Sequence, residues 1–133
     1  MADRLNLTGR WDGTYRYADG VGPDTPFVAR VSENGVRFLG EIIEPNEFRP
    51  EIANATIEGV RAGRAVEFTK SYHGAGPAYE TPVEYSGQLS EDGNTIAGTW
   101  TLLEFEGFFE MMREQEKEEP ETAEVSVTVP RLT

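Results

Sequence analysis

The chain has 133 residues, with 24 acidic against 12 basic side chains and a formal net charge of −12. This length suits one domain with one core, and the negative charge argues against a nucleic-acid partner because it repels phosphate. The absence of cysteine excludes disulfides, a thiol nucleophile and a thiolate metal site. No apolar signal-peptide run opens the chain, and no segment approaches the roughly 20 apolar residues of a membrane span. We therefore expect a cytoplasmic protein without a membrane partner.

The first predicted element is a strand that covers residues 7–17. Its residues alternate between an apolar or glycine face, which carries Trp11, Tyr15 and Tyr17, and a polar face. A period of two with one apolar face is typical of a strand that buries one side. Gly9 and Gly13 lie on the apolar face, where glycine permits sharp coiling and leaves room for a bulky neighbour.

Seven further segments show the same alternation and are predicted to be strands. Short turns such as Asn-Gly and Asp-Gly separate several of them, and such pairs favour the tight turns of β-hairpins. The segments cover residues 26–32, 36–43, 51–60, 65–73, 82–90, 95–103 and 107–113.

The order of the segments predicts an all-β fold, an eight-stranded antiparallel up-and-down barrel. No long helix is predicted between them, so neighbours should pair antiparallel, and closure removes exposed sheet edges. The connections alternate in length: residues 33–35, 61–63 and 91–94 form tight turns, whereas 18–26, 44–51 and 73–81 are long. Odd-numbered connections share one end of such a barrel, so we expect the long loops to surround a mouth. The short seventh connection, 104–107, leaves one side of that mouth lower.

The composition changes after residue 113. We assign residues 1–113 to the barrel domain and 114–133 to an acidic linker with a possible extra strand at 123–129, which could lie on the outside of the barrel or pair with a second copy of the chain. An alternative interpretation makes 105–118 a helix, because it contains good helix formers, and then 123–129 becomes the eighth strand.

The segment "LTGRWDGTY" resembles the first strand of the calycins, the avidin- and lipocalin-type small barrels. Gly9-Arg10-Trp11 matches their Gly-x-Trp motif, in which the Trp packs across the closed end. Gly98-Thr99-Trp100 is more similar to the avidin group, and Arg113 is the closest match to the basic residue that lipocalins pack over that first Trp. The resemblance implies a barrel that binds a small molecule. Two departures argue against biotin as the ligand: Gly13 replaces a polar contact, and Ile42, Ile43 and Glu44 replace polar partners on the third strand.

Two single residues are candidates for chemistry near the mouth. Lys70 shares the inward face with Phe68 and Tyr72, so its ammonium could hold the carboxylate of an amphipathic ligand; alternatively, its stem covers apolar wall while the charge reaches water. His73, the only histidine, could act as a general base or haem ligand, or could be an exposed loop residue. No second haem ligand or orienting group is identifiable, and we assign no cofactor, metal or catalytic residue.

Aromatic residues gather toward the expected mouth, including Tyr79 and Phe48 in the long loops. We therefore expect a binding barrel for a small, partly apolar or amphipathic ligand rather than an enzyme. The alternatives are a filled barrel that acts as a protein-interaction or oligomerisation module, with outward Leu39 and Ile43 as partner contacts, and an enzyme that uses the mouth. The expected ligand contacts are Tyr15, Tyr17, Phe38, Lys70, Tyr72, His73, Tyr85 and Trp100.

Overall fold

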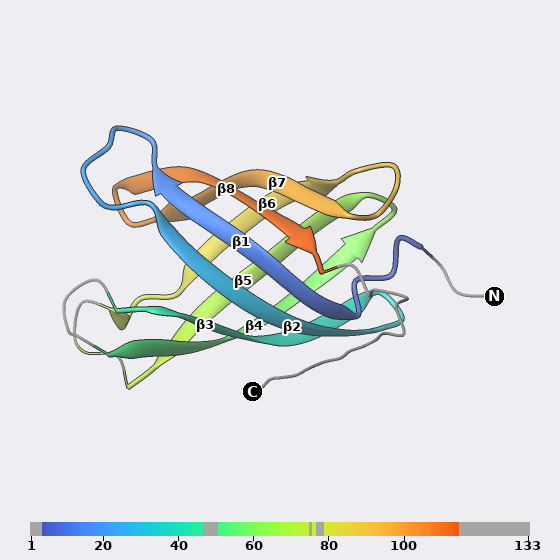
Figure 1. Cartoon of the computed structure of the whole chain (residues 1–133), viewed down its shortest axis with the longest axis horizontal. Helices are drawn as coiled ribbons and strands as arrows, with labels where there is room; N and C mark the ends of the chain where they lie inside the picture. Colours follow the sequence, from blue (N-terminus) through green and yellow to red (C-terminus); the bar gives the residue numbers. More distant parts are fainter. Residues whose placement is uncertain (1–3, 47–50, 75, 77–78, 115–133) are drawn as a thin grey trace, which may run out of the picture.

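A computed structural model of the chain describes residues 4–46, 51–74, 76 and 79–114. These residues form eight antiparallel strands in sequence order that close into one barrel, as Figure 1 shows. The predicted fold is confirmed. Phe48 and the possible strand at 123–129 lie outside the described residues. The strands are β1 (Gly9–Tyr17), β2 (Thr25–Asn34), β3 (Arg37–Pro45), β4 (Ile52–Ala62), β5 (Ala65–His73), β6 (Val83–Leu89), β7 (Thr95–Leu102) and β8 (Phe105–Arg113).

The closure of the barrel depends on pairing between β1 and β8. This pairing runs from Trp11 opposite Arg113 to Tyr17 opposite Gly107. Along β8 the buried residues are Gly107, Phe109 and Met111, which is the period of a strand. The helix alternative is therefore wrong for residues 105–113, because alternation with one buried face outweighs the helix propensity of Glu, Met and Arg.

The two ends of the barrel differ in their connections. Two-residue connections join β2 to β3 and β4 to β5, and residues 90–94 join β6 to β7, all at the end on the right of Figure 1. The opposite end carries the longer β1–β2, β3–β4 and β5–β6 connections, together with a two-residue connection from β7 to β8. The asymmetry expected from loop lengths is thus present, and the right-hand end is called the closed end and the left-hand end the mouth.

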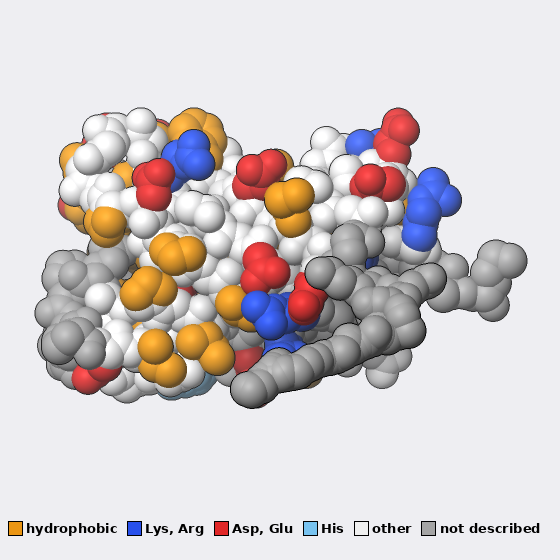
Figure 2. Space-filling model, viewed as in Figure 1, with side chains coloured by type: hydrophobic (Ala, Val, Ile, Leu, Met, Phe, Trp, Pro, Cys, Tyr) orange, Lys and Arg blue, Asp and Glu red, His pale blue; other side chains and the backbone are white. Residues whose placement is uncertain are grey.

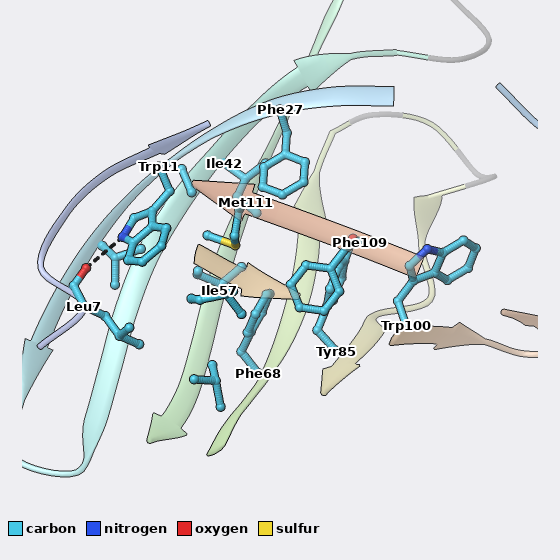
Figure 3. Packing of buried hydrophobic residues seen from close by; sticks show 14 of the residues in the cluster. Leu7, Trp11, Phe27, Ile42, Ile57, Phe68, Tyr85, Trp100, Phe109 and Met111 are labelled. Atoms are coloured by element: carbon cyan, nitrogen blue, oxygen red, sulfur yellow. Dashed lines mark hydrogen bonds between the residues drawn. The ribbon is translucent and has the colours of Figure 1, made fainter. Parts of the chain in front are cut away.

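A continuous hydrophobic core fills the barrel from the closed end to its middle. Figure 3 shows Trp11 and Leu7 at one side of this core and Trp100 at the other, with aromatic and aliphatic side chains between them. Phe68 stacks on Tyr85 with ring centroids 4.7 Å apart, and Phe109 meets Tyr85 edge-on at 5.0 Å. This packing leaves the mouth end as the part of the barrel with free internal space.

The closed end is sealed by Arg113 and the segment that precedes β1. The Arg113 guanidinium lies 4.5 Å from the centre of the Trp11 ring, as the resemblance to lipocalins implied. Its N–H groups also donate to the backbone carbonyl oxygens of Asn6, Thr8 and Gly93 at 2.8–3.0 Å. A single cation therefore joins β8, the first residues of the chain and the β6–β7 turn.

Glycine makes room for aromatic rings at two places inside the wall. A Cβ on Gly13 would collide with the Phe27 ring, and a Cβ on Gly107 would come within 2.6 Å of the Trp100 indole. A side chain at Gly107 would therefore collide with both the Arg16 backbone and the Trp100 ring. The expectation that interior glycines admit bulky neighbours is borne out at these two positions.

The outer surface carries exposed hydrophobic side chains as well as charged ones. In Figure 2 the hydrophobic side chains on the visible face gather mainly over the half of the barrel nearer the mouth. Leu39 and Ile43 point outward as expected, with 60% and 48% of their surface exposed.

Candidate functional site

A cavity of about 560 Å³ opens at the mouth end of the barrel. Its walls come from the ends of β1, β5 and β7, the starts of β6 and β8, and the β1–β2 and β5–β6 connections. This volume lies within the usual range for small-molecule sites, roughly 300–1,000 Å³. The lining residues are Tyr15, Tyr17, Val21, Gly22, Pro23, Lys70, Tyr72, Tyr79, Thr81, Val83, Tyr85, Trp100, Leu102 and Phe105.

A buried ion pair joins Lys70 to Glu44 at this cavity. Lys70 Nζ lies 3.0 Å from Glu44 Oε1, and the two side chains are 1% and 0% exposed. Both residues follow from strand alternation: Glu44 continues the inward face of Phe38 and Ile42 on β3, and Lys70 continues that of Val66 and Phe68 on β5. Charges this deeply buried require close pairing, which each supplies to the other.

Two tyrosine hydroxyl groups complete the coordination of the Glu44 carboxylate. Tyr72 Oη donates to Glu44 Oε2 at 2.7 Å, and Tyr15 Oη donates to the same oxygen at 3.0 Å. Glu44 thus accepts hydrogen bonds from β1 and from two positions on β5. The carboxylate holds these two strands together across the interior of the barrel.

Three aromatic rings surround the Lys70 ammonium. Its Nζ lies 4.6 Å from the centre of the Tyr15 ring, 4.7 Å from that of Tyr72 and 5.2 Å from that of Tyr85. A cation this close to ring faces is attracted by their quadrupoles, most strongly where water is excluded. The ammonium is therefore stabilised by one carboxylate and by an aromatic cage that the chain itself supplies.

This environment shifts the pKa values of the ionisable groups around the pair. Burial by itself lowers the pKa of Lys70, but its interactions with Tyr85 and Glu44 outweigh this effect, so the pKa lies above its usual value. Burial raises the pKa of Tyr72, and the negative charge of Glu44 raises it further. Burial also raises the pKa of Tyr85. Near neutral pH all three side chains keep their protons and act as hydrogen-bond donors.

The remaining wall of the cavity is mainly aromatic. Tyr17 meets the Trp100 ring edge-on with centroids 5.0 Å apart, and Phe105 meets Tyr17 in the same way at 6.1 Å. Tyr79, from the β5–β6 connection, packs on Tyr72 at 4.5 Å. The indole N–H of Trp100 donates to the Arg16 carbonyl oxygen at 3.2 Å, which fixes the ring at the mouth.

Six of the eight expected contact residues line the cavity: Tyr15, Tyr17, Lys70, Tyr72, Tyr85 and Trp100. The other two lie elsewhere. Phe38 packs against Phe68 in the hydrophobic core, with ring centroids 6.0 Å apart. His73 is exposed at the end of β5, and its Nε2 lies 3.0 Å from the Thr56 hydroxyl. Alternation explains this position, because His73 follows inward Tyr72 and so faces outward.

Sequence reasoning missed Glu44. It placed this residue in the connection after the third strand and counted it among the residues that replace the polar partners of the avidin group. In the structure, β3 extends to Pro45 and places Glu44 inward. The signal was present, since Phe38, Gly40, Ile42 and Glu44 alternate without interruption. The alternative in which the Lys70 charge reaches water is also wrong, because Lys70 is only 1% exposed and pairs with Glu44.

The structure contains no candidate metal centre in its described part. Within residues 4–46, 51–74, 76 and 79–114, no three or more acidic or histidine side chains come together in a way that could hold a metal ion. Across the same residues, no helix has the length and apolar character that a membrane span requires.

Known structures resemble this chain in fold. A redesigned β-barrel superposes with a TM-score of 0.66 at 12% identity, over 83% of this chain and 92% of that one. This match supports the fold, a closed eight-stranded antiparallel barrel. A mutant of the fluorescent protein UnaG aligns over 83% of this chain and 97% of its own, with a TM-score of 0.47 and 12% identity. No protein-family model and no curated protein sequence matches the chain.

Proposed function

We propose that the barrel binds a small, partly apolar molecule in the cavity at its mouth. The observation that carries this proposal is the 560 Å³ cavity, whose wall is mainly aromatic and aliphatic and whose inner end carries an organised polar cluster around Lys70. A concave apolar site with a few well-placed polar groups is the usual form of a small-molecule site. The alternative of a filled barrel leaves this space unexplained.

The contacts that we propose for the ligand are the aromatic residues of the wall together with Lys70. Tyr17, Trp100 and Phe105 offer aromatic surface near the entrance, and Tyr85 offers aromatic and Val83 aliphatic surface deeper inside. The raised pKa values of Lys70, Tyr72 and Tyr85 suit hydrogen bonding better than proton abstraction near neutral pH. This supports binding as the primary function.

Filling the cavity with a larger side chain at a wall position tests the proposal. Val83 is 5% exposed and lines the cavity, so the large ring in Val83→Trp takes up space that a ligand needs. Glu84→Trp places the same ring on the adjacent, outward-facing residue and is the matched control. The uncharged dye Nile red, whose fluorescence rises in apolar surroundings, serves as the probe.

We expect Nile red to bind the native protein and Glu84→Trp equally, and to bind Val83→Trp at least about ten-fold more weakly. Circular dichroism and thermal unfolding establish that each variant is folded, and Val83→Phe provides a smaller step if the Trp variant is not. The proposal is wrong if the native protein does not bind the dye or any molecule detected by native mass spectrometry, or if filling the cavity leaves dye binding unchanged.

A further inference from the structure

We infer that the cavity selects uncharged ligands and rejects carboxylates of the same shape. This inference rests on the proposed function and narrows it. Its basis is that the Lys70–Glu44 pair already balances its own charge inside the barrel. The only charged residue in the cavity wall, within the described part of the chain, is therefore neutralised before a ligand arrives.

The contacts of Glu44 show why an anionic ligand is disfavoured. Its Oε1 accepts a hydrogen bond from Lys70 Nζ, and its Oε2 accepts hydrogen bonds from two tyrosine hydroxyl groups. A ligand carboxylate could reach Lys70 only by displacing the carboxylate of Glu44, which would then be buried without its cation. Leaving a buried charge unpaired is strongly unfavourable, so the covalently held carboxylate keeps its place.

The charges around the mouth act in the same direction. Exposed acidic residues occupy the β1–β2, β5–β6 and β7–β8 connections and the start of β8, and the chain as a whole has a net charge of −12. Such a field lowers the local concentration of anions at the entrance. These residues are Asp19, Asp24, Glu80, Glu104 and Glu106.

A cationic ligand would also find no favourable binding site at the inner end of the cavity. The ring faces of Tyr15, Tyr72 and Tyr85 are already directed at Lys70 Nζ, at 4.6–5.2 Å. A second cation would therefore meet the Lys70 charge where it needed a ring face. The acidic rim attracts cations to the surface without providing a partner inside.

The surfaces that remain suit an uncharged, flat or aliphatic molecule. Trp100, Tyr17 and Phe105 present aromatic surface near the entrance, and Leu102 and Val83 present aliphatic surface. Burial of apolar area against these side chains supplies the driving force for binding. The cavity therefore fits an uncharged aromatic or aliphatic compound with few polar groups.

A matched pair of ligands tests this selection on the full-length protein. Naphthoate and its uncharged methyl ester have nearly the same ring and differ in charge, and each is titrated against bound Nile red. We expect the ester to displace the dye at a concentration at least about ten-fold lower than naphthoate. Equal displacement by both compounds would overturn the inference and leave the proposed function intact, whereas no binding of dye or ester would overturn both.

Variants of the ion pair identify the cause of the selection. Glu44→Gln removes the internal carboxylate and leaves Lys70 unpaired, so naphthoate should bind at least about ten-fold more tightly than to the native protein and should raise the thermal midpoint of this variant. The double variant Glu44→Gln with Lys70→Met contains neither charge and should again prefer the ester. If Glu44→Gln gains no naphthoate binding, the internal carboxylate is not what excludes anions, and the inference is wrong in its mechanism. If this variant does not fold, the comparison of ester with naphthoate in the native protein and in the double variant still decides the selection.

Discussion

The two ends of the barrel use the same residue type for different purposes. Trp11 at the closed end is fully buried, donates its indole N–H to the Leu7 carbonyl oxygen at 2.9 Å and lies under the Arg113 guanidinium. Trp100 also donates to a backbone carbonyl, but its ring forms part of the cavity wall beside Tyr17. Both belong to Gly-x-Trp triplets. The end of the barrel at which each ring lies, rather than the triplet, decides whether the ring seals the core or faces a ligand.

The cations of the two ends differ in the same way. Arg113 is held by backbone carbonyl oxygens and joins segments of the chain, whereas Lys70 is held by a carboxylate inside the barrel. The closed end also has an ion pair, between Arg61 and Glu33 at 2.8 Å, whose side chains are 11% and 2% exposed. At the mouth end both members of the Lys70–Glu44 pair are almost fully buried, so its stability depends on the charge state of buried side chains.

The largest expected effect comes from removing the ring that seals the closed end. Trp11→Ala should lower the free energy of unfolding by about 3–5 kcal/mol, because it leaves a large cavity in packed core. Urea denaturation followed by circular dichroism measures the change. Nile red affinity of the folded variant should stay within about two-fold of the native value, whereas Trp100→Ala should weaken it at least about ten-fold. Equal effects of the two variants on dye binding would contradict the division between the ends.

The next largest effect is expected when one member of the Lys70–Glu44 pair is removed and the other stays buried. Glu44→Gln should lower the free energy of unfolding by roughly 3 kcal/mol, because Lys70 then stays buried without an anion. The double variant with Lys70→Met should be within about 1 kcal/mol of the native protein, since replacing both members of a buried pair is often nearly neutral. Urea midpoints of the two variants test this, and a double variant as unstable as the single one would refute the explanation.

Alkaline pH should weaken the mouth end selectively. The pKa values of Lys70, Tyr72 and Tyr85 are raised in the folded protein, so above about pH 10 the unfolded chain loses protons that the folded chain retains. Stability is then fully present below this pH and decreases as the pH rises, by about 1 kcal/mol per pH unit for each group that remains protonated only in the folded state.

Two measurements check this pH dependence. Urea midpoints should fall above about pH 10, and the ultraviolet absorbance of tyrosinate should rise in step with unfolding for the buried tyrosines. The double variant Glu44→Gln with Lys70→Met should lose stability less steeply, because Lys70 no longer contributes. If all five tyrosines ionise while the protein is still folded, hydroxide reaches the tyrosines at the mouth and the prediction is wrong.

A smaller effect is expected when the cation of the closed end is removed. Arg113→Gln should lower the free energy of unfolding by about 1–2 kcal/mol, because it removes the contact with Trp11 and charge-assisted hydrogen bonds to three carbonyl oxygens. Arg10→Gln is the control, since Arg10 forms exposed pairs with Asp12 and Glu114 that should each contribute under about 1 kcal/mol. Thermal unfolding compares them, and no difference would mean that Arg113 does not seal the closed end.

The smallest effect is expected for the only histidine. His73 is exposed and lies outside the cavity lining, so His73→Ala should change the free energy of unfolding by less than about 0.5 kcal/mol and leave Nile red binding unchanged. Dye titration and thermal unfolding test both points. A clear loss of binding would place His73 at the site, contrary to its position on the outer face.

Strand alternation predicted most of the fold and much of the cavity wall. It gave eight strands, and the lengths of the connections distinguished the mouth from the closed end. Tyr72 and Tyr85 could be placed inside because each occupies an inward position near a strand end. Phe38 failed as a cavity residue because alternation tells which face a side chain takes and not how far along the barrel it lies relative to other strands. That depends on register, which pairs Phe38 with Glu33 and Gly59 near the closed end.

The sequence by itself determined the closed, antiparallel barrel, because alternation, tight turns and glycines act over a few residues and each can be recognised within a short segment. Only the tertiary structure decided the character of the mouth. Glu44 and Lys70 are 26 residues apart on strands that do not pair, and they meet because closure and stagger bring inward side chains together across the interior. A lysine that looked ready for a ligand carboxylate is thus paired with a carboxylate of its own chain, since burial requires each charge to find an opposite one.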